Sequence, residues 1–435
     1  MPDLDLADVR KLVVAFRRAV ADQLSKVSTH SPAEERAAAS RITYQVLDAW
    51  SKNNRVPMDA DTLAWLHDQV INELFGLGRL QALVDDPEIE NIQISGWDTV
   101  FVIRGGGEKL RVAPVCDTDE ELIQLVYRAA ATMSNTPRLF DSAHPLVSFR
   151  LPDGSRMSAT MDICERPDVS IRRHSFADAD LESLVQRGTL SPKLAEMLDA
   201  AVRARLNILI GGSMNAGKTT LLRALAACIP SRERIVTIES ALELELAKQT
   251  DPEGRPRHPD VLAMETRDAN AEGYGAVDMP TLVAHSLRKN ADRVILGEIL
   301  GGEVINMLNV MTQGVSGSMG TIHADSSANV FTKIANYAAQ SAERLGLEAS
   351  ALAVAAALHL VVYVHFDPLT NRRVVNSVRE VTGVNGMQVV SNEIWRPGPA
   401  GDAIPGAPMS DELRTKLARY GYVTPTEEVW QRDAI

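Results

Sequence analysis

Several features are scarce in this 435-residue sequence, and each scarcity excludes a class of protein. The three cysteines, Cys116, Cys164 and Cys228, are odd in number and lack ligand-like spacing, which favours reduced thiols in the cytosol over a disulfide framework. The first ten residues are acidic and contain no apolar core, so we expect no secretory signal. The longest apolar run, residues 349–366, is alanine-rich and interrupted by His359, which predicts a helix entering a strand rather than a membrane span.

Basic residues are also fewer than acidic residues. The 45 Lys and Arg residues against 57 Asp and Glu residues give a net charge of -12 and a pI of about 5.3. This balance weighs against nucleic acid as the main partner, although it leaves room for a local basic groove. A hydrophobic content of 45% and a charged content of 23% are typical of a soluble globular protein, and the length predicts two or three domains.

The strongest motif lies in residues 207–228. An apolar strand over 207–210 runs into glycines, the pattern G-x-x-x-x-G-K-[ST] follows, and a helix is predicted over 220–228. An ordinary glycine turn would not need this order of strand, loop and helix, whereas a phosphate-binding loop does. The sequence therefore predicts a nucleotide site with these residues: Gly212, Ser213, Met214, Asn215, Ala216, Gly217, Lys218, Thr219 and Thr220.

The residue types of this loop suit ATP and Mg²⁺ as cofactors. Glycines let backbone N–H groups curl around a polyphosphate, and the helix N-terminus adds a partial positive charge. Lys218 would reach the β- and γ-phosphates, and the Thr219 hydroxyl would ligate Mg²⁺. Contacts to the base lie outside the motif, so the choice between ATP and GTP stays open.

The pattern around the loop predicts an α/β fold with a doubly wound, mainly parallel sheet, followed by antiparallel hairpins. Its strands are expected over 234–239, 293–298, 318–323 and 360–366, with turns at 367–371 and 385–386. The expected organisation is a helical region over 1–72, a small α+β domain over 73–175, a polar hinge over 176–190, the P-loop domain over 191–396 and a tail over 397–435.

Two parts of the first 175 residues have a specific interpretation. The N-terminal helices are either a partner-docking arm or a plain helical layer, and we favour the layer because nothing there carries chemistry. In the α+β domain, a helix over 118–133 begins at a capping box of Thr118 and Glu121. A hairpin then joins 146–151 to 156–161.

Arginines gather at the end of that hairpin. With a three-residue loop, Arg150 and Arg156 lie opposite each other, and Arg172 and Arg173 end the next strand. One interpretation is a cluster that reaches phosphates from outside the P-loop domain. The other is a set of solvated strand-end charges, which the residues alone favour.

Three polar residues end strands of the P-loop domain, where ligands bind in such sheets. They are Glu239, Glu298 and His323. A carboxylate there can orient or deprotonate the attacking water, or hold a water of the Mg²⁺ shell. A histidine there is a γ-phosphate sensor or a hydrogen-bonded structural residue.

Several longer segments resemble one family. RIVTIE at 234–239, ETRDANAEGYG at 265–275, LRKNADRVILGEILGGE at 287–303 and SGSMGTIHADS at 316–326 are similar to type II/type IV secretion ATPases. FGLGRLQALVDDPEIENIQISG, VSFRLPDGSRMSA and VSIRRHSF extend the resemblance to about residues 70–395, and it is nearest to tight-adherence (Flp) pilus ATPases of the CpaF/TadA kind.

The resemblance implies a hexameric ATPase with a RecA-like domain, peripheral at the cytoplasmic base of a pilus or secretion machine. Its partner would be an inner-membrane platform protein, and pilin or a secreted substrate would be acted on indirectly. It implies that Glu298 is the Walker B catalytic glutamate, Glu239 the Asp-box glutamate and His323 the second His-box histidine. It assigns to phosphates or subunit interfaces these arginines: Arg150, Arg156, Arg173 and Arg267.

Three positions depart from the family pattern: Ser240, Leu300 and Val315 replace an aspartate, an arginine and a histidine. Each loses a polar group whose charge-assisted contact is worth roughly 1.5–3 kcal/mol. The leading hypothesis is a motor, and the departures favour as an alternative a catalytically weakened scaffold subunit. A DNA-conjugation ATPase shares the P-loop, but the acidic pI argues against it.

Overall fold

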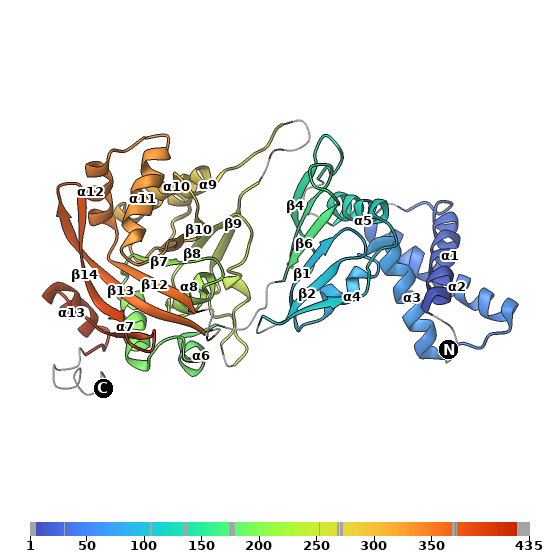
Figure 1. Cartoon of the computed structure of the whole chain (residues 1–435), viewed down its shortest axis with the longest axis horizontal. Helices are drawn as coiled ribbons and strands as arrows, with labels where there is room; N and C mark the ends of the chain where they lie inside the picture. Colours follow the sequence, from blue (N-terminus) through green and yellow to red (C-terminus); the bar gives the residue numbers. More distant parts are fainter. Residues whose placement is uncertain are drawn as a thin grey trace. The chain divides into compact units, whose positions relative to one another are not determined.

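The computed structural model describes residues 6–29, 31–104, 107–133, 138–173, 179–251, 253–267, 269, 273–367, 370 and 372–423. The chain divides into two compact units, residues 1–175 and 176–435, and each is described by itself (Figure 1). Each buried core cluster draws its residues from one unit alone.

The first unit begins with three helices that pack on one another. Their shared core includes Phe16, Val20, Leu47 and Val70, and the Phe16 ring meets the Trp50 ring edge-on. Apolar residues at helical spacing on each helix create this core, as the sequence predicts. The bounds are α1 (Leu6–Leu24), α2 (Pro32–Asn54) and α3 (Ala60–Phe75).

A six-stranded sheet completes the first unit, in the order β3-β2-β1-β6-β5-β4. Alternate residues of each strand pack under two helices, so one face is apolar and the other is open. The helices are α4 (Leu80–Asp85) and α5 (Asp119–Thr132). The strands are β1 (Ile89–Ser95), β2 (Val100–Arg104), β3 (Lys109–Val112), β4 (Leu146–Arg150), β5 (Arg156–Thr160) and β6 (Asp168–Arg172).

The predicted capping box at α5 is half right. The Thr118 hydroxyl accepts the Glu121 N–H at 3.1 Å, as predicted. The Glu121 carboxylate, however, accepts the N–H of Asp117 at 2.8 Å rather than that of Thr118. The reciprocal bond therefore falls one residue earlier, although the helix begins where the sequence indicates.

The second unit is built on a nine-stranded sheet in the order β15-β14-β13-β12-β7-β11-β10-β8-β9. The strands from β12 to β9 are parallel, and β13 to β15 extend the sheet antiparallel, as the sequence predicts. The strands are β7 (Ile208–Gly212), β8 (Ile235–Glu239), β9 (Val261–Glu265), β10 (Arg293–Ile299), β11 (Met319–His323), β12 (Leu360–Asp367), β13 (Arg372–Asn385), β14 (Gln388–Pro397) and β15 (Ala403–Pro405).

Helices cover both faces of this sheet (Figure 1). In β7, Ile208 and Ile210 pack towards one layer, and Leu209 towards the other, because successive side chains of a strand point to opposite faces. One layer holds α6 (Leu181–Gln186), α7 (Pro192–Arg203), α8 (Lys218–Ala226) and α13 (Asp411–Ala418). The other holds α9 (Met279–Ser286), α10 (Glu303–Thr312), α11 (Asn329–Gln340) and α12 (Leu347–Ala357), and two short 3-10 helices are η1 (Leu246–Lys248) and η2 (Leu287–Lys289).

Some intervals differ from their expected character. The interval assigned to a hinge contains α6, whose Leu181 and Leu184 are buried in the core of the second unit. The interval assigned to a tail adds β15 to the sheet. The short helix expected there around residues 411–420 is confirmed as α13, which packs Leu413 and Leu417 on the same core. Strand β9 is absent from the sequence prediction because its residues alternate too weakly to stand out. The turn predicted at 367–371 lies partly outside the described residues.

The apolar run over 349–366 is a helix entering a strand, as predicted, because α12 ends at Ala357 and β12 begins at Leu360. Within the described part of the chain, no helix combines the length and hydropathy needed to cross a membrane.

Candidate nucleotide site

The phosphate-binding loop lies between β7 and α8 and has the conformation its glycines allow. Asn215 and Gly217 have positive φ angles of 59° and 97°, which turn the chain back into the helix. A Cβ on Gly212 would lie 2.6 Å from the Val364 carbonyl oxygen, so a larger residue there would push the loop away from β12. Ala216 is buried, whereas Ser213, Met214 and Asn215 are exposed around the mouth of the loop. The backbone thus forms an open cradle of the kind that holds a polyphosphate.

Lys218, His323 and Glu298 form a continuous chain of contacts beside the loop. Lys218 Nζ donates to the Ser213 carbonyl oxygen at 2.9 Å and lies 3.1 Å from His323 Nδ1. His323 Nε2 lies 2.6 Å from Glu298 Oε1. The structure therefore brings together the lysine, the histidine and one of the glutamates that the sequence singles out.

The geometry also decides the tautomer of His323. An ammonium group has only donors, so His323 Nδ1 accepts from Lys218 and carries no proton. Nε2 must then carry the proton and donate it to the Glu298 carboxylate. The imidazole thus links the Lys218 ammonium group to the Glu298 carboxylate.

Glu239 lies at the end of β8 and is 2% exposed. Its Oε2 accepts the N–H groups of Glu243 and Leu244 at 2.7 and 2.8 Å, while Oε1 has no partner among the described residues. Burial raises the pKa of Glu239 to about 7, against the opposing effect of the two N–H donors. This carboxyl group is therefore poised to change charge near neutral pH.

Gly297, which directly precedes Glu298 in β10, lies where there is no space for a larger side chain. A Cβ at Gly297 would lie 2.9 Å from Glu239 Cγ. The glycine thus makes room for the Glu239 side chain between neighbouring strands, and its carbonyl accepts the Thr321 hydroxyl at 2.6 Å. Gly297 and Glu239 are therefore packed closely against each other.

The three departures from the family pattern occupy different environments. Ser240 and Leu300 are exposed, and Val315 is buried in an apolar core. The Leu300 N–H donates to Glu303 Oε1 at 2.5 Å, so its backbone helps to begin α10 while its side chain is exposed. Val315 packs in the core at the position where the family pattern has a polar histidine.

The hydrogen bond and bridge of Arg267 are to residues 275 and 277 rather than to the phosphate-binding loop. It is exposed, and its Nε donates to the Gly275 carbonyl oxygen at 2.6 Å across a bridge between Arg267 and Val277. Of the ETRDANAEGYG segment around it, residues 268 and 270–272 lie outside the described residues.

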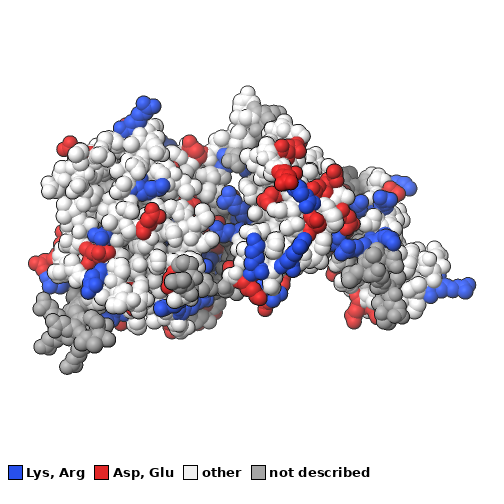
Figure 2. Space-filling view, in the orientation of Figure 1, with Lys and Arg blue, Asp and Glu red and all other residues white. Residues whose placement is uncertain are grey.

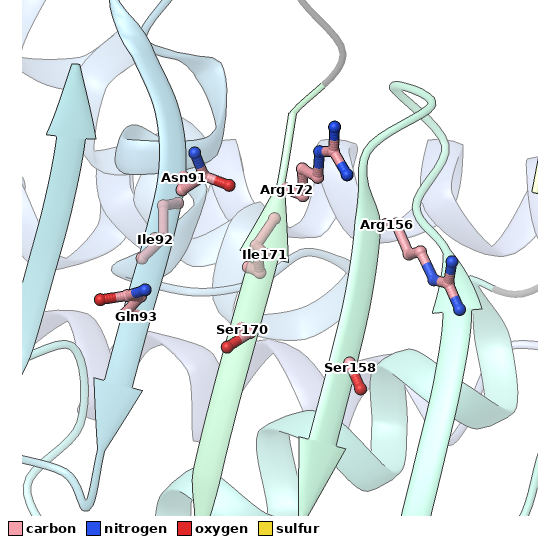
Figure 3. Close-up of a pocket in the computed structure, with 8 residues that line it drawn as sticks. All are labelled: Asn91, Ile92, Gln93, Arg156, Ser158, Ser170, Ile171 and Arg172. Atoms are coloured by element: carbon pink, nitrogen blue, oxygen red, sulfur yellow. The ribbon is translucent and has the colours of Figure 1, made fainter. Parts of the chain in front are cut away.

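The arginines of the first unit form a row on the open face of its sheet. Arg150 pairs with Arg156 across the hairpin, as predicted, and Arg156 pairs with Arg172 on the next strand. Asn91 of β1 pairs with Arg172 and extends the row. Figure 3 shows Asn91, Arg172 and Arg156 at one level, with Gln93, Ser170 and Ser158 at the next, where they line a pocket of about 130 Å³.

Arg173, rather than Arg172, is the position that the resemblance assigns to phosphates. In the structure Arg173 is half-buried, and its guanidinium donates to the Asp86 carbonyl oxygen. Arg172 is exposed beside Arg156 instead, because successive side chains of a strand point to opposite faces. The row on the open face is therefore made by Arg150, Arg156 and Arg172.

A divalent cation would have Thr219, half-buried at the start of α8, as its protein ligand. Among the described residues no three His, Cys, Asp or Glu side chains converge on a metal position. The donor set therefore fits an ion held largely by phosphate oxygens and water, as Mg²⁺ is in phosphate-binding loops.

A parallel α/β sheet with a phosphate-binding loop, and with a glutamate and a histidine at the ends of adjacent strands, defines a P-loop nucleoside triphosphatase. Residues 74–390 match the family described as "Type II/IV secretion system protein". The chain belongs to this family of secretion ATPases and is an ATP hydrolase.

Two curated relatives support this membership. A protein of Mycobacterium tuberculosis named "Putative conjugal transfer protein" is 30% identical over 360 residues, which are 80% of this chain and 95% of the relative. The type IV secretion system protein VirB11 of Brucella suis is 30% identical over 287 residues, 60% of this chain and 76% of the relative. The crystal structure of the Brucella suis VirB11 ATPase with sulphate has 27% identity and a TM-score of 0.37, covering 70% of this chain and 96% of that one.

Proposed function

We propose that the protein is a hexameric motor of the tight-adherence pilus type, which hydrolyses Mg²⁺-ATP to power pilus assembly or protein secretion. It would act at the inner face of the cytoplasmic membrane against a platform protein embedded there. The observation that carries the proposal is the family match over residues 74–390, which extends over parts of both units. The matched residues include Lys218, His323 and Glu298, which form a chain of contacts in the structure.

The proposed roles follow from the chemistry of each group. Lys218 and the loop N–H groups hold the phosphates, and Thr219 ligates Mg²⁺. Glu298 orients or deprotonates the attacking water, and His323 senses the γ-phosphate through its contact with Lys218. Glu239 supplies a second carboxylate. Arg150, Arg156 and Arg267 complete the charge around the phosphates or at subunit interfaces, with Arg172 in place of Arg173 because Arg172 shares the exposed row.

The test measures steady-state Mg²⁺-ATP hydrolysis and ATP binding in parallel for wild type and Glu298→Gln. The amide keeps the shape of the carboxylate but is no base, so turnover should fall by about 10²–10⁴-fold while ATP affinity persists. Lys218→Ala should lose binding. Equal loss of binding and turnover in Glu298→Gln would show that its assigned role is wrong, and a monomer by light scattering with nucleotide would contradict the hexamer.

A weakened scaffold subunit is a second candidate, and the exposed Leu300 and buried Val315 are what favour it. Both positions lack the polar groups that the family pattern supplies, so slow, partner-stimulated turnover is expected. Binding of ATP without turnover, even with a membrane platform protein added, would favour the scaffold.

Conjugative DNA transfer is a third candidate, favoured by the name of the Mycobacterium tuberculosis relative. The net charge of -12 weighs against it, and Figure 2 shows acidic and basic side chains interspersed on the face it draws. Salt-dependent binding of double-stranded DNA would support this candidate over a secretion motor.

A further inference from the structure

The loop strand β7 divides the site into two sides. On one side lies β11, whose His323 pairs with Gly212, and beyond it β10 carries Glu298. Hydrolysis takes place at the γ-phosphate, so this phosphate must lie towards His323 and Glu298. The rest of the nucleotide then extends towards the other neighbour of β7, which is β12.

At that second side, two residues from adjacent strands meet beside the loop. Val364 of β12 pairs with Gly212, and Phe366 lies two residues further along the same strand. Phe366 pairs directly with Arg373 of β13, and the Arg373 guanidinium carbon lies 5.2 Å from the centre of the Phe366 ring. Phe366 is half-buried, and its side chain packs against the core of the second unit, which fixes the position of the ring.

Arg373 is also tied to the loop itself. Its Nε donates to the Asn215 carbonyl oxygen at 2.9 Å, and its Cδ lies 3.4 Å from where a Cβ on Gly217 would be. The guanidinium plane is thereby oriented by a hydrogen bond on one edge and a ring on one side, while the side chain as a whole stays exposed. An oriented and exposed planar cation of this kind is a stacking surface for another planar ring.

We propose that Phe366 and Arg373 form a platform on which the nucleobase of the bound nucleoside triphosphate stacks. The inference rests on the nucleotide site and on ATP hydrolysis, not on the choice between pilus, secretion and conjugation. Any nucleobase can stack on an aromatic or guanidinium surface, and such stacking changes the binding affinity by about 10-fold or more. The platform supplies base contacts that the loop motif lacks.

The test compares ATP with inorganic tripolyphosphate, which has the phosphates but no base. Both are titrated into the full-length protein, with tripolyphosphate measured as a competitor of a fluorescent ATP analogue. Arg373→Ala should weaken ATP binding about 10-fold and leave tripolyphosphate binding unchanged. In hydrolysis, KM for ATP should rise with kcat preserved, because a base contact holds ground state and transition state alike.

Two further variants separate stacking from charge and from folding. Arg373→Lys keeps the charge but removes the plane, so it should behave like Arg373→Ala, and binding equal to wild type would overturn the proposal. Arg372→Ala removes the neighbouring arginine, which donates instead to the Gly188 carbonyl oxygen at 3.2 Å, and should bind ATP normally. An equal loss of ATP and tripolyphosphate binding in Arg373→Ala would mean that Arg373 only shapes the loop.

These outcomes are distinct from failure of the proposed function. If wild type does not bind ATP, the nucleotide site itself is wrong and the platform falls with it. If wild type binds ATP and Arg373→Ala binds it equally well, the site stands and the platform alone is rejected. Phe366→Ala, checked for folding by thermal unfolding, should repeat the selective loss of ATP affinity.

Discussion

At the scale of single residues, the two glutamates of the site are held differently. Glu298 is about one-third exposed and reaches His323, whereas Glu239 is buried and accepts the N–H groups of Glu243 and Leu244. A carboxylate that is to meet water and substrate has to be accessible. This difference in exposure is consistent with the roles that we propose, in which Glu298 meets the attacking water and Glu239 supports it.

Gly297→Ala tests the space that Glu239 needs. The added Cβ would lie 2.9 Å from Glu239 Cγ, so the strand or the glutamate must shift, and we expect a loss of about 1–3 kcal/mol in the free energy of unfolding. Gly320→Ala in β11 is the matched control, because its Cβ would find its nearest neighbour at an ordinary 3.5 Å. Urea denaturation measures both. Similar stability of the two variants would refute the close packing.

The raised pKa of Glu239 predicts an unusual dependence of stability on pH. The folded pKa of about 7 exceeds the ordinary value of 4.5, so between these pH values the folded state binds a proton that the unfolded state has lost. Protonation therefore stabilises the fold fully below pH 4.5, and this contribution, on the order of 3 kcal/mol, is lost as pH rises to 7.

Glu239→Gln cannot ionise and should lack this loss. Thermal unfolding between pH 5 and 8 should show the melting temperature of wild type falling relative to that of the variant as pH rises. Glu348→Gln, at an exposed position, serves as the control and should follow wild type. A difference between wild type and Glu239→Gln that does not change with pH would contradict the raised pKa.

At the scale of elements, a buried ion pair joins the strands to the helix that precedes the loop. Arg293, at the start of β10, is 0% exposed and donates to Glu233 at 2.7 Å, to the Val202 carbonyl oxygen at 2.9 Å and to the Gly317 carbonyl oxygen at 3.2 Å. These bonds connect the end of α7, the approach to β8 and the loop before β11. A Cβ on Gly317 would overlap the guanidinium, which accounts for glycine there.

Arg293→Ala should therefore cost about 3–5 kcal/mol of stability, because buried Glu233 would keep only its longer contact with Arg205, at 3.7 Å. Arg234→Ala is the matched control. Arg234 pairs with Asp260 at 2.8 Å, but both side chains are more than one-third exposed, so about 0–1 kcal/mol is expected. Denaturant unfolding distinguishes the two, and equal losses would show that burial does not set the value of the Arg293 pair.

At the scale of the whole molecule, the two units have separate cores. No buried cluster among the described residues combines positions before and after 175, so each unit should unfold as a cooperative body of its own. The nucleotide loop, its lysine, its histidine and both glutamates belong to the second unit. The arginine row belongs to the first.

A fragment of residues 176–435 should consequently bind ATP but hydrolyse it slowly. It keeps the phosphate cradle but lacks the arginine row of the first unit, and removal of such an arginine from comparable sites costs about 10³-fold or more. Nucleotide binding and turnover are measured side by side with the full chain and with an Arg150→Ala, Arg156→Ala double variant. Turnover by the fragment equal to that of the full chain would exclude a catalytic part for the first unit.

Local patterns in the sequence were enough to predict the loop, the parallel strands on each side of it and the ends of those strands. Lys218 follows from the loop motif, and Glu239, Glu298 and His323 follow from the rule that ligands meet the C-terminal ends of parallel strands. A turn of three residues was enough to place Arg150 opposite Arg156. These features depend on residues close together in the chain, whose spacing carries the information.

Other features depend on residues far apart, so only the tertiary structure decided them. Arg373 reaches Asn215 across 158 positions of sequence, because β13 pairs with β12 and β12 with β7. Gly297 accommodates Glu239 because β10 lies beside β8, and Arg172 joins the arginine row because of strand register. The sequence by itself determined which groups could do the chemistry, since motif spacing is local. Packing decided which of them meet, since contact between distant segments is set by the fold as a whole.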